Sequence, residues 1–246
     1  MSQQNVYDND VFYEGYKKIR NNTGNANIII EKPALFSLLP DLKGKRVLDL
    51  GCGYGENCVE FGKRGANKIV GIDISEKMLR VALEENKKDN IEYIKIAMED
   101  ISIITERFDI IISSLAVHYI KDFNKLLKDI YKLLIAEGIL IFSQENPINT
   151  CFSSGQRWTR VDGNVVHANL YNYSFDGERK SEWFVNNVIK YHRTFSSIVN
   201  SLVMENFSIE KMIEPVASKE NMEKYPEYKR DIHKPDFLLV RAKKMV

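Results

Sequence analysis

The stretch VLDLGCGYG, Val47 to Gly55, places three glycines within five positions, directly after a mostly apolar run. Such a run is typical of a strand buried in a parallel sheet. Glycines after the strand let the backbone turn tightly and approach a ligand that a Cβ atom would exclude. The stretch therefore predicts a nucleotide or nucleoside site at the carboxyl end of a strand in an α/β sheet.

Further strands follow at regular intervals, and helical patterns separate them. Apolar runs predict strands at residues 46–50, 68–73, 91–96, 108–114 and 139–143. Gly138 is expected to open the last of these. A helix over 56–64 and helices capped by Ser75 and Asp122 show apolar residues at helical spacing. Strands that alternate with helices predict a mostly parallel sheet with right-handed crossovers.

The ends of the chain and one long insert lie outside this alternation. Residues 11–20 have near-helical spacing, and a short helix over 32–39 is predicted with Pro33 in its first turn. Residues 146–190 show no clear period and are expected to form an irregular insert. The chain is then predicted to continue with a helix capped by Thr194, the run 207–213 and a last strand at 236–244.

The charge of the chain is nearly balanced, with 35 Lys and Arg against 34 Asp and Glu. A balanced chain has no overall field that attracts nucleic acid or an anionic membrane, so neither partner is expected. The polar first residues predict no signal or transit peptide, and no apolar run approaches the roughly 20 residues of a membrane span. Cys52, Cys58 and Cys151 lack metal-ligand spacing, so we expect reduced thiols, a cytoplasmic location and no metal site.

Acidic residues around the glycines narrow the choice of ligand. A dinucleotide-binding loop has the pattern GxGxxG, but Glu56 occupies the last glycine position and puts a negative charge where a pyrophosphate would lie. Asp49, two residues before Gly51, suits a cationic amino group. Asp73, at the end of the second strand, can accept hydrogen bonds from both hydroxyls of a ribose. Because NAD enzymes also have an acid at this position, Asp73 indicates a nucleoside but does not show which cofactor carries it.

In these features the sequence resembles the class I S-adenosylmethionine-dependent methyltransferases. The resemblance rests on five segments in the family's order: VLDLGCGYG (47–55), GIDIS (71–75), AMED (97–100), FDIIISSLAVHYI (108–120) and LLIAEGILIFS (133–143). It implies a Rossmann-like, doubly wound, seven-stranded sheet, mostly parallel, whose antiparallel last strand is the run 236–244. Outside the core, SQENP (143–147) and KYHRT (190–194) are similar to an uncharacterised bacterial subgroup of methyltransferase type 11-like proteins and name no substrate.

The resemblance implies S-adenosylmethionine as the cofactor, S-adenosylhomocysteine as its product, and roles for individual residues. Asp49, Gly51 and Gly53 are expected to line the methionine part. Asp73 is expected to hold the ribose, with Ile74 against the adenine. The other expected cofactor contacts are Cys52, Met78, Met98, Glu99, Ser114 and Leu115.

Two further positions bear on the resemblance. Ala97 stands where many relatives have an aspartate, so a polar adenine contact is expected to be missing or moved to Glu99. Near the N-terminus, Tyr16 and Arg20 match a Tyr-x-x-x-Arg pattern of related lids, and Arg20 could pair with the cofactor carboxylate. A solvated helix face with one buried tyrosine explains the same pattern equally well.

The resemblance also implies a division of the chain. We expect an N-terminal helical lid over 1–44 and a methyltransferase domain over 45–246, with core motifs at 45–145 and an insert at about 146–190. Nine of the 45 residues 151–195 are aromatic, a fifth, against 11% in the whole chain. An aromatic stretch after the fifth strand favours a lid around a small apolar or aromatic acceptor. A satellite core packed on the sheet is the equal alternative.

No motif identifies catalytic residues, because transfer from a sulfonium mainly requires an oriented acceptor and a dry site. A general base is needed only where the acceptor must lose a proton early. Candidates for this role are His118, His167, His192 and Glu145, although histidines in such places more often make structural hydrogen bonds. Expected substrate contacts are His118, Tyr119, Glu145, Asn146, Trp158, Trp183 and Arg193.

The sequence thus predicts an S-adenosylmethionine-dependent methyltransferase that acts on a small molecule by in-line displacement. An RNA or protein methyltransferase is the first alternative, which the balanced charge and the lack of a nucleic-acid module disfavour. A non-catalytic sensor of the cofactor is the second. A dinucleotide oxidoreductase is the third, which Glu56 and the later motifs oppose. The sequence makes no prediction of oligomeric state.

Overall fold

The strand that precedes the glycines lies near the middle of a seven-stranded sheet. The computed structural model describes residues 4–152 and 155–246, and orders the strands β10-β11-β5-β4-β1-β2-β3. They are β1 (Arg46–Leu50), β2 (Lys68–Asp73), β3 (Ile91–Lys95), β4 (Phe108–Ser113), β5 (Leu134–Glu145), β10 (Phe207–Ile213) and β11 (Phe237–Lys244). Neighbours from β3 to β5 are parallel, and β11 is antiparallel to β5 and β10. The predicted fold class, with its antiparallel last strand, is confirmed.

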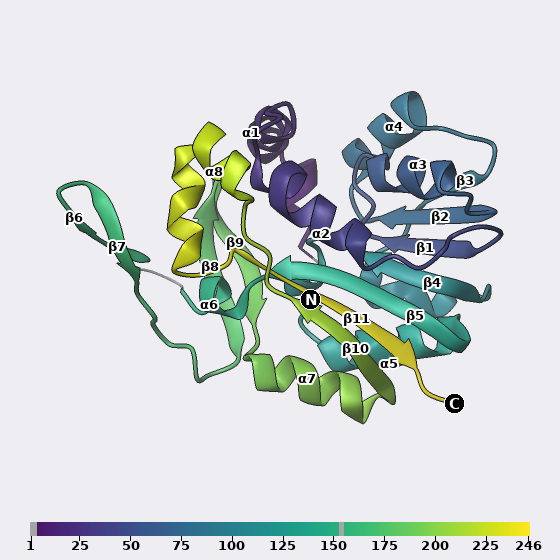
Figure 1. The fold of residues 1–246 in the computed structure, drawn as a ribbon. Coiled ribbons are helices and arrows are strands. Elements are labelled where there is room, and N and C mark those ends of the chain that lie inside the picture. The colour runs from purple at the N-terminus through teal and green to yellow at the C-terminus, as the bar shows by residue number, and fades with distance from the viewer. Residues whose placement is uncertain (1–3, 153–154) are drawn as a thin grey trace.

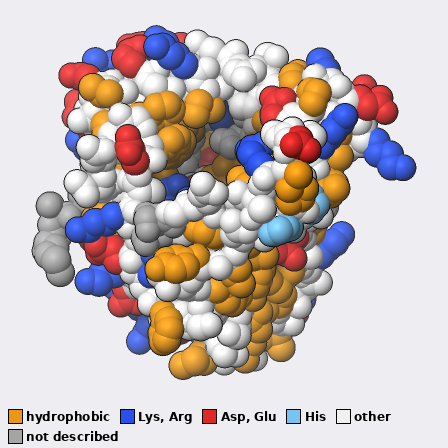
Figure 2. All heavy atoms as spheres, turned by 90° about the vertical axis from the view of Figure 1, so that its left-hand side faces the viewer, with side chains coloured by type: hydrophobic (Ala, Val, Ile, Leu, Met, Phe, Trp, Pro, Cys, Tyr) orange, Lys and Arg blue, Asp and Glu red, His pale blue; other side chains and the backbone are white. Residues whose placement is uncertain are grey.

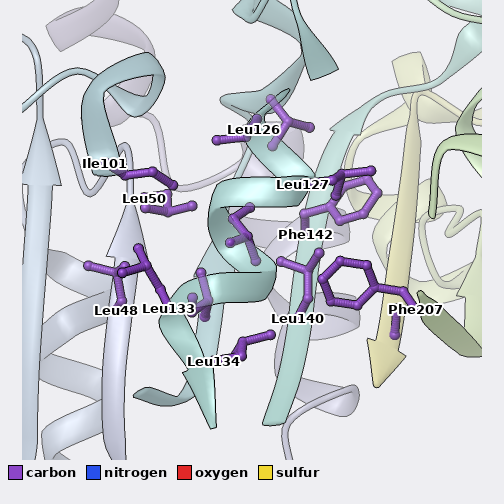
Figure 3. Packing of buried hydrophobic residues seen from close by; sticks show 14 of the residues in the cluster. Leu48, Leu50, Ile101, Leu126, Leu127, Leu133, Leu134, Leu140, Phe142 and Phe207 are labelled. Carbon is purple, nitrogen blue, oxygen red and sulfur yellow. The ribbon is translucent and has the colours of Figure 1, made fainter. Parts of the chain in front are cut away.

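Helices cover both faces of this sheet (Figure 1). One face packs against α2 (Lys32–Ser37), α3 (Glu56–Lys63) and α4 (Glu76–Glu85), and the other against α5 (Phe123–Leu133) and α7 (Phe195–Met204). The alternation of side chains along β1 serves both layers. Val47 packs toward the first group, whereas Leu48 and Leu50 pack on the side of the α5 leucines (Figure 3). The apolar core therefore fixes β1, and with it the position of the glycine loop.

The expectation of an irregular insert after the fifth strand is wrong. The insert contains a short helix and two antiparallel hairpins: α6 (Pro147–Thr150), β6 (Trp158–Val161) with β7 (Asn164–Ala168), and β8 (Gly177–Trp183) with β9 (Val185–His192). Both hairpins contain a register shift, and most of their residues keep contact with solvent. These strands consequently lack the apolar alternation that would have marked them in the sequence. In Figure 1 the β6–β7 hairpin projects away from the sheet.

The predicted start of the fifth strand is also wrong. β5 begins at Leu134, directly after α5, and Gly138 lies inside the strand. Leu134 is fully buried and pairs with Phe108, and the register between β4 and β5 shifts after that pair. Glu137 has a positive φ of 59°. The glycine therefore marks an irregularity within the strand instead of its beginning.

The N-terminal elements and the β8–β9 hairpin gather at the end of the sheet where the parallel strands finish (Figure 1). The N-terminal elements are η1 (Val6–Asp8), α1 (Asp10–Arg20) and the turn η2 (Asn27–Glu31), and near them lie α8 (Lys219–Lys224) and η5 (Pro226–Ile232). Asp8 accepts hydrogen bonds from Ser75 Oγ at 2.6 Å and from the backbone N–H of Lys77 at 3.1 Å, which ties η1 to the start of α4. The domain boundary at residue 44 stays a prediction.

Candidate active site

A cavity of about 800 Å³ lies at the carboxyl ends of the parallel strands. Its floor comes from the loops after β1, β2, β3 and β4, and its roof from α1 and the tip of the β8–β9 hairpin. Figure 2 shows a hollow in the face turned toward the left of Figure 1, bordered by hydrophobic side chains. The structure brings these sequence-predicted residues to the cavity: Tyr16, Arg20, Gly51, Cys52, Gly53, Asp73, Ile74, Met78, Met98, Glu99, Ser114, Leu115, His118, Tyr119, Glu145 and Trp183.

The three glycines of the loop have different surroundings. All three have positive φ, and a Cβ atom on Gly55 would lie 2.2 Å from the Tyr93 hydroxyl. A Cβ on Gly51 would lie 2.8 Å from that of Ala116, whereas nothing lies within 4 Å of the Cβ position of Gly53. Two glycines are therefore required by packing. Gly53 leaves open space beside the backbone at the cavity, where a ligand can approach it.

Asp73 joins the glycine loop to the end of β2. Its Oδ2 accepts a hydrogen bond from the backbone N–H of Gly53 at 2.9 Å, and its Oδ1 accepts one from that of Ser75 at 2.8 Å. Burial raises the pKa of this carboxyl group, although the two backbone donors oppose the shift. Each oxygen retains a further lone pair for a ligand hydroxyl. The geometry fits the predicted contact with a ribose.

Asp49 does not reach the cavity. It is 1% exposed beneath the loop, its Oδ2 accepts a hydrogen bond from the Cys58 thiol at 3.3 Å, and its Oδ1 has no partner among the described residues. Burial raises its pKa to about 7. The predicted contact between Asp49 and the amino group of a ligand therefore stays a prediction, and this structure does not bring the carboxylate to the cavity surface.

Arg20 lines the cavity, but a protein carboxylate already pairs with it, and its predicted contact with the cofactor stays a prediction. Its guanidinium forms an ion pair with Glu56, whose side chain is 43% exposed. The ring of Tyr16 packs edge-on against Trp183, with 6.2 Å between the ring centres. Helix α1 thus contributes an aromatic ring, Tyr16, and a cation, Arg20, to the roof. Glu56, the residue that disfavours a pyrophosphate, holds Arg20 in place.

Two candidates from the KYHRT segment lie away from the cavity. His192 is fully buried, with its Nδ1 2.8 Å from Thr150 Oγ1 and its Nε2 2.8 Å from the carbonyl oxygen of Tyr173. Because a carbonyl only accepts, Nε2 carries the proton and Nδ1 accepts from the hydroxyl. Arg193 donates to the carbonyl of Ile120, and burial lowers its pKa to about 10. His192 thus joins parts of the insert to one another, and Arg193 fastens the end of the insert to Ile120.

Asn146, Trp158 and His167 also lie outside the cavity lining. Asn146 is fully buried, and its Oδ1 accepts from the backbone N–H of Ile148, at the start of α6. The ring of Trp158 packs under Lys234 Nζ, at 4.5 Å. His167 is exposed on β7. Four histidines and tryptophans between residues 158 and 192 were candidates, and of these only Trp183 lines the cavity.

His118 and Glu145 meet where β5 ends at the cavity. His118 belongs to the turn η4 (Val117–Tyr119), and its Nδ1 accepts the backbone N–H of Glu145 at 3.5 Å. Burial lowers the pKa of His118 to about 4. Burial alone would raise the pKa of Glu145, but the ammonium of Lys190 lowers it to about 2. At neutral pH the site therefore holds a neutral imidazole beside an ionised carboxylate.

Several residues at the site gave no signal in the sequence. Tyr7 and Phe184 line the cavity, and Tyr7 lies 5.2 Å from Tyr16 between ring centres. Glu31 does not line the cavity, but it is 2% exposed and accepts hydrogen bonds from the hydroxyls of Ser114 and Ser143, near the ends of β4 and β5. Burial raises the pKa of Glu31. Tyr7 and Phe184 come from segments without a motif, so only their tertiary position marks them.

Comparison with known proteins identifies the family of this fold and cavity. A sequence model described as a methyltransferase domain matches residues 48–142. The chain is 31% identical to a solved S-adenosylmethionine dependent methyltransferase from Mesorhizobium loti, with a TM-score of 0.80, over 92% of this chain and 100% of that one. The chain belongs to the class I S-adenosylmethionine-dependent methyltransferases.

Two further relatives resemble this methyltransferase over nearly its whole length. A solved structure from Listeria monocytogenes, described as an S-adenosylmethionine dependent methyltransferase, is 35% identical with a TM-score of 0.79, and the match covers 88% of this chain and 98% of that one. An uncharacterised protein of Haemophilus influenzae is 41% identical over 247 residues, which is 98% of this chain and 97% of the relative.

The residues at the cavity fit the family's cofactor. The open space at Gly53 and the two lone pairs left on Asp73 suit a nucleoside, and no phosphate-binding cradle is required. When bound, S-adenosylmethionine supplies a methyl group on a positively charged sulfur, already activated for transfer. Across residues 4–152 and 155–246, no cluster of three His, Cys, Asp or Glu side chains could hold a metal ion, and no helix is long and apolar enough to cross a membrane.

Proposed function

We propose that this methyltransferase transfers the methyl group to a small molecule, which binds beside the cofactor at the β5 side of the cavity. The observation that carries the proposal is the roof of the cavity. Tyr7 and Tyr16 from the N-terminal segment and Trp183 and Phe184 from the hairpin close over the strand ends. A roofed, aromatic-walled cavity of about 800 Å³ has the size and lining of small-molecule sites.

The cofactor is proposed to occupy the β1–β3 side. Asp73 would accept from the ribose hydroxyls, and Ile74, Met98 and Glu99 would surround the adenine. The methionine part would lie against the glycine loop and the backbone around Ser114, as the family resemblance implies. Because these residues occupy consecutive strand ends, the nucleoside uses one side of the cavity and leaves the other free.

The free side is the proposed acceptor site. It is bounded by the end of β5 at Glu145, by the η4 turn with His118 and Tyr119, and by Trp183 of the roof. Here the chain's residues have to orient the acceptor and exclude water, since the methyl group arrives activated. The aromatic roof excludes water, and the polar groups of Glu145 and His118 orient the acceptor.

The charges at the cavity support a small molecule over RNA. Among the described lining residues the cations are Lys18, Arg20 and Arg230, and Arg20 is paired with Glu56. A nucleic-acid site needs a row of basic groups along the backbone path, because phosphate contacts dominate its affinity. The cavity offers instead three cations among aromatic and acidic groups.

Transfer of labelled methyl from S-adenosylmethionine to a fractionated bacterial extract tests this proposal. We expect label in compounds below about 1 kDa, in the size range of ligands that such cavities enclose. Label confined to RNA or protein would contradict the small-molecule proposal. Tight calorimetric binding of S-adenosylhomocysteine without transfer to any fraction would favour the cofactor sensor.

A further inference from the structure

A partly buried ion pair lies at the end of β5, on the proposed acceptor side. Glu145 lines the cavity, and its Oε1 accepts a hydrogen bond from Lys190 Nζ of β9, whose side chain is 13% exposed. The same ammonium lies 5.2 Å from the ring centre of Trp183, behind the cavity wall. Taking two charges out of water is costly, and such pairs often add nothing to stability over apolar residues of the same size. Stability alone therefore does not account for an ion pair at this position.

One oxygen of Glu145 remains available to a ligand. Lys190 bonds Oε1, and no described residue donates a hydrogen bond to Oε2. The side chain keeps 25% of its surface exposed, and it lines the cavity. An ionised carboxylate only accepts hydrogen bonds. Whatever binds against Oε2 must therefore present an N–H or O–H group.

The groups around Glu145 favour the nitrogen donor. His118 is the only histidine among the described residues of the lining, and its low pKa makes it a weak base at neutral pH. A hydroxyl acceptor must lose its proton early, and it would find here a weak base and a fixed negative charge that opposes an oxyanion. A neutral nitrogen has a free lone pair and needs no early deprotonation.

We infer that the acceptor is a nitrogen nucleophile, a small flat molecule whose neutral amine donates to Glu145 between the aromatic walls of the cavity. The inference rests on the proposed small-molecule function. The walls are paired edge-on, with Tyr7 6.3 Å from Tyr119 and Tyr16 6.2 Å from Trp183 between ring centres. Walls of this kind bury a flat ring against faces and edges.

Glu145 would also act on the transfer step itself. The nitrogen lone pair forms the new bond to the methyl carbon while the carbon–sulfur bond breaks and leaves its electron pair on sulfur. Positive charge passes from sulfur to nitrogen, and the nitrogen then releases its proton to water. A carboxylate that accepts from this N–H binds more strongly as the charge develops, so it stabilises the transition state more than the ground state.

Lys190 is a positioning residue in this arrangement. It does not line the cavity, but it fixes one oxygen of Glu145 and keeps the carboxylate ionised. Lys190→Met should therefore raise the pH at which activity is lost on the acid side of the kcat/KM profile. Lys190→Arg, which restores the cation, should return that limb toward its wild-type position. A purely structural lysine would change stability without moving the profile.

The decisive experiment compares matched aromatic amines, phenols and benzoates as acceptors of labelled methyl from S-adenosylmethionine. We expect N-methylated products from the amines. Glu145→Gln should lower kcat/KM for them at least tenfold and leave the calorimetric affinity for S-adenosylhomocysteine within twofold. The matched control is Glu182→Gln, which removes an exposed carboxylate of β8 and should change neither quantity. The double variant with Lys190→Met removes both charges and guards against misfolding around an unpaired ammonium.

The outcomes separate this inference from the proposal beneath it. Preferred methylation of the phenols or benzoates, or amine turnover unchanged in Glu145→Gln, would overturn the nitrogen acceptor and leave the small-molecule function intact. Label found only in RNA or protein would instead overturn the small-molecule function, and the inference with it.

Discussion

The two sides of the cavity are built in different ways. The cofactor side comes from consecutive strand ends, with the glycine loop, Asp73 and Glu99 all within about 50 residues of sequence. The proposed acceptor side gathers Tyr119, Glu145 and Trp183 from three separate parts of the chain. In the proposed division, local motifs therefore determine which donor binds, whereas tertiary packing determines which acceptor binds. This difference explains why related chains can share one cofactor and differ in what they methylate.

The two sides also differ in their buried acids. Beneath the glycine loop, burial without a cation raises the pKa of Asp49 to about 7. At the end of β5, the pKa of Glu145 is about 2, because Lys190 outweighs the burial. One acid thus favours its neutral form, and the other is held as an anion. The variants below test the two sides separately.

The largest expected effect is on the cofactor side. Asp73→Ala should weaken binding of S-adenosylhomocysteine tenfold or more, because hydrogen bonds to a charged group contribute about 1.5–3 kcal/mol. Asp73 anchors Gly53 as well as the proposed ribose contact. Calorimetry measures the affinity. Asp109→Ala is the control, because Asp109 also accepts a backbone N–H, from Arg46 at 3.0 Å, and does not line the cavity. Equal losses in both variants would contradict the ribose role.

A glycine-to-alanine substitution, made once in α1 and once in α3, tests the packing of the roof. A Cβ on Gly15 of α1 would lie 2.5 Å from the Phe184 ring, so Gly15→Ala should cost about 1–3 kcal/mol of unfolding free energy through overpacking. Gly62 of α3 has its nearest neighbour at 3.6 Å, so Gly62→Ala should instead stabilise by about 0.5–1 kcal/mol. Chemical denaturation measures both. A stable Gly15→Ala protein would show that α1 and the hairpin do not pack as one roof.

Asp49 and Glu145 give opposite pH dependences of the unfolding free energy. A folded-state pKa raised above the unfolded value of 3.8 means that Asp49 stabilises the fold at low pH, and that this contribution is lost as the pH rises toward 7. In the cofactor-free protein, the unfolding free energy should fall between pH 5 and 8 as Asp49 ionises. Asp49→Asn should make this fall smaller by roughly 2 kcal/mol. Glu145, with a lowered pKa, loses its contribution only as the pH falls below about 4.5 toward 2. Glu145→Gln should therefore leave the slope above pH 5 unchanged. A flattened slope in Glu145→Gln and not in Asp49→Asn would contradict the assignment.

The smallest effect is expected at the edge of the roof. Glu56 pairs with Arg20, but its side chain is 43% exposed, and exposed pairs contribute about 0–1 kcal/mol. Glu56→Gln should change the affinity for S-adenosylhomocysteine threefold at most by calorimetry. A tenfold loss would show that Glu56 orients Arg20 for the cofactor.

The sequence predicted the sheet, and it marked most of the residues that line the proposed cofactor side, because both depend on local patterns. Buried parallel strands are continuous apolar runs, and their ends fix the positions of Gly53 and Asp73. The hairpins of the insert escaped prediction because their strands bury no continuous face. His192 and Trp158 were candidates by residue type, but chain topology turns them into supports of the insert. Lys190 belongs to the KYHRT segment (190–194), which resembles the family, but nothing in the sequence indicated that it pairs with Glu145.

The division of the cavity is tested most directly by a crystal structure of the chain with S-adenosylhomocysteine. The predicted result has both ribose hydroxyls on the Asp73 carboxylate, the adenine beside Ile74 and Met98, and no contact between the ligand and Glu145. A ligand that lies across Glu145, or a ribose held away from Asp73, would contradict the division into a cofactor side and an acceptor side.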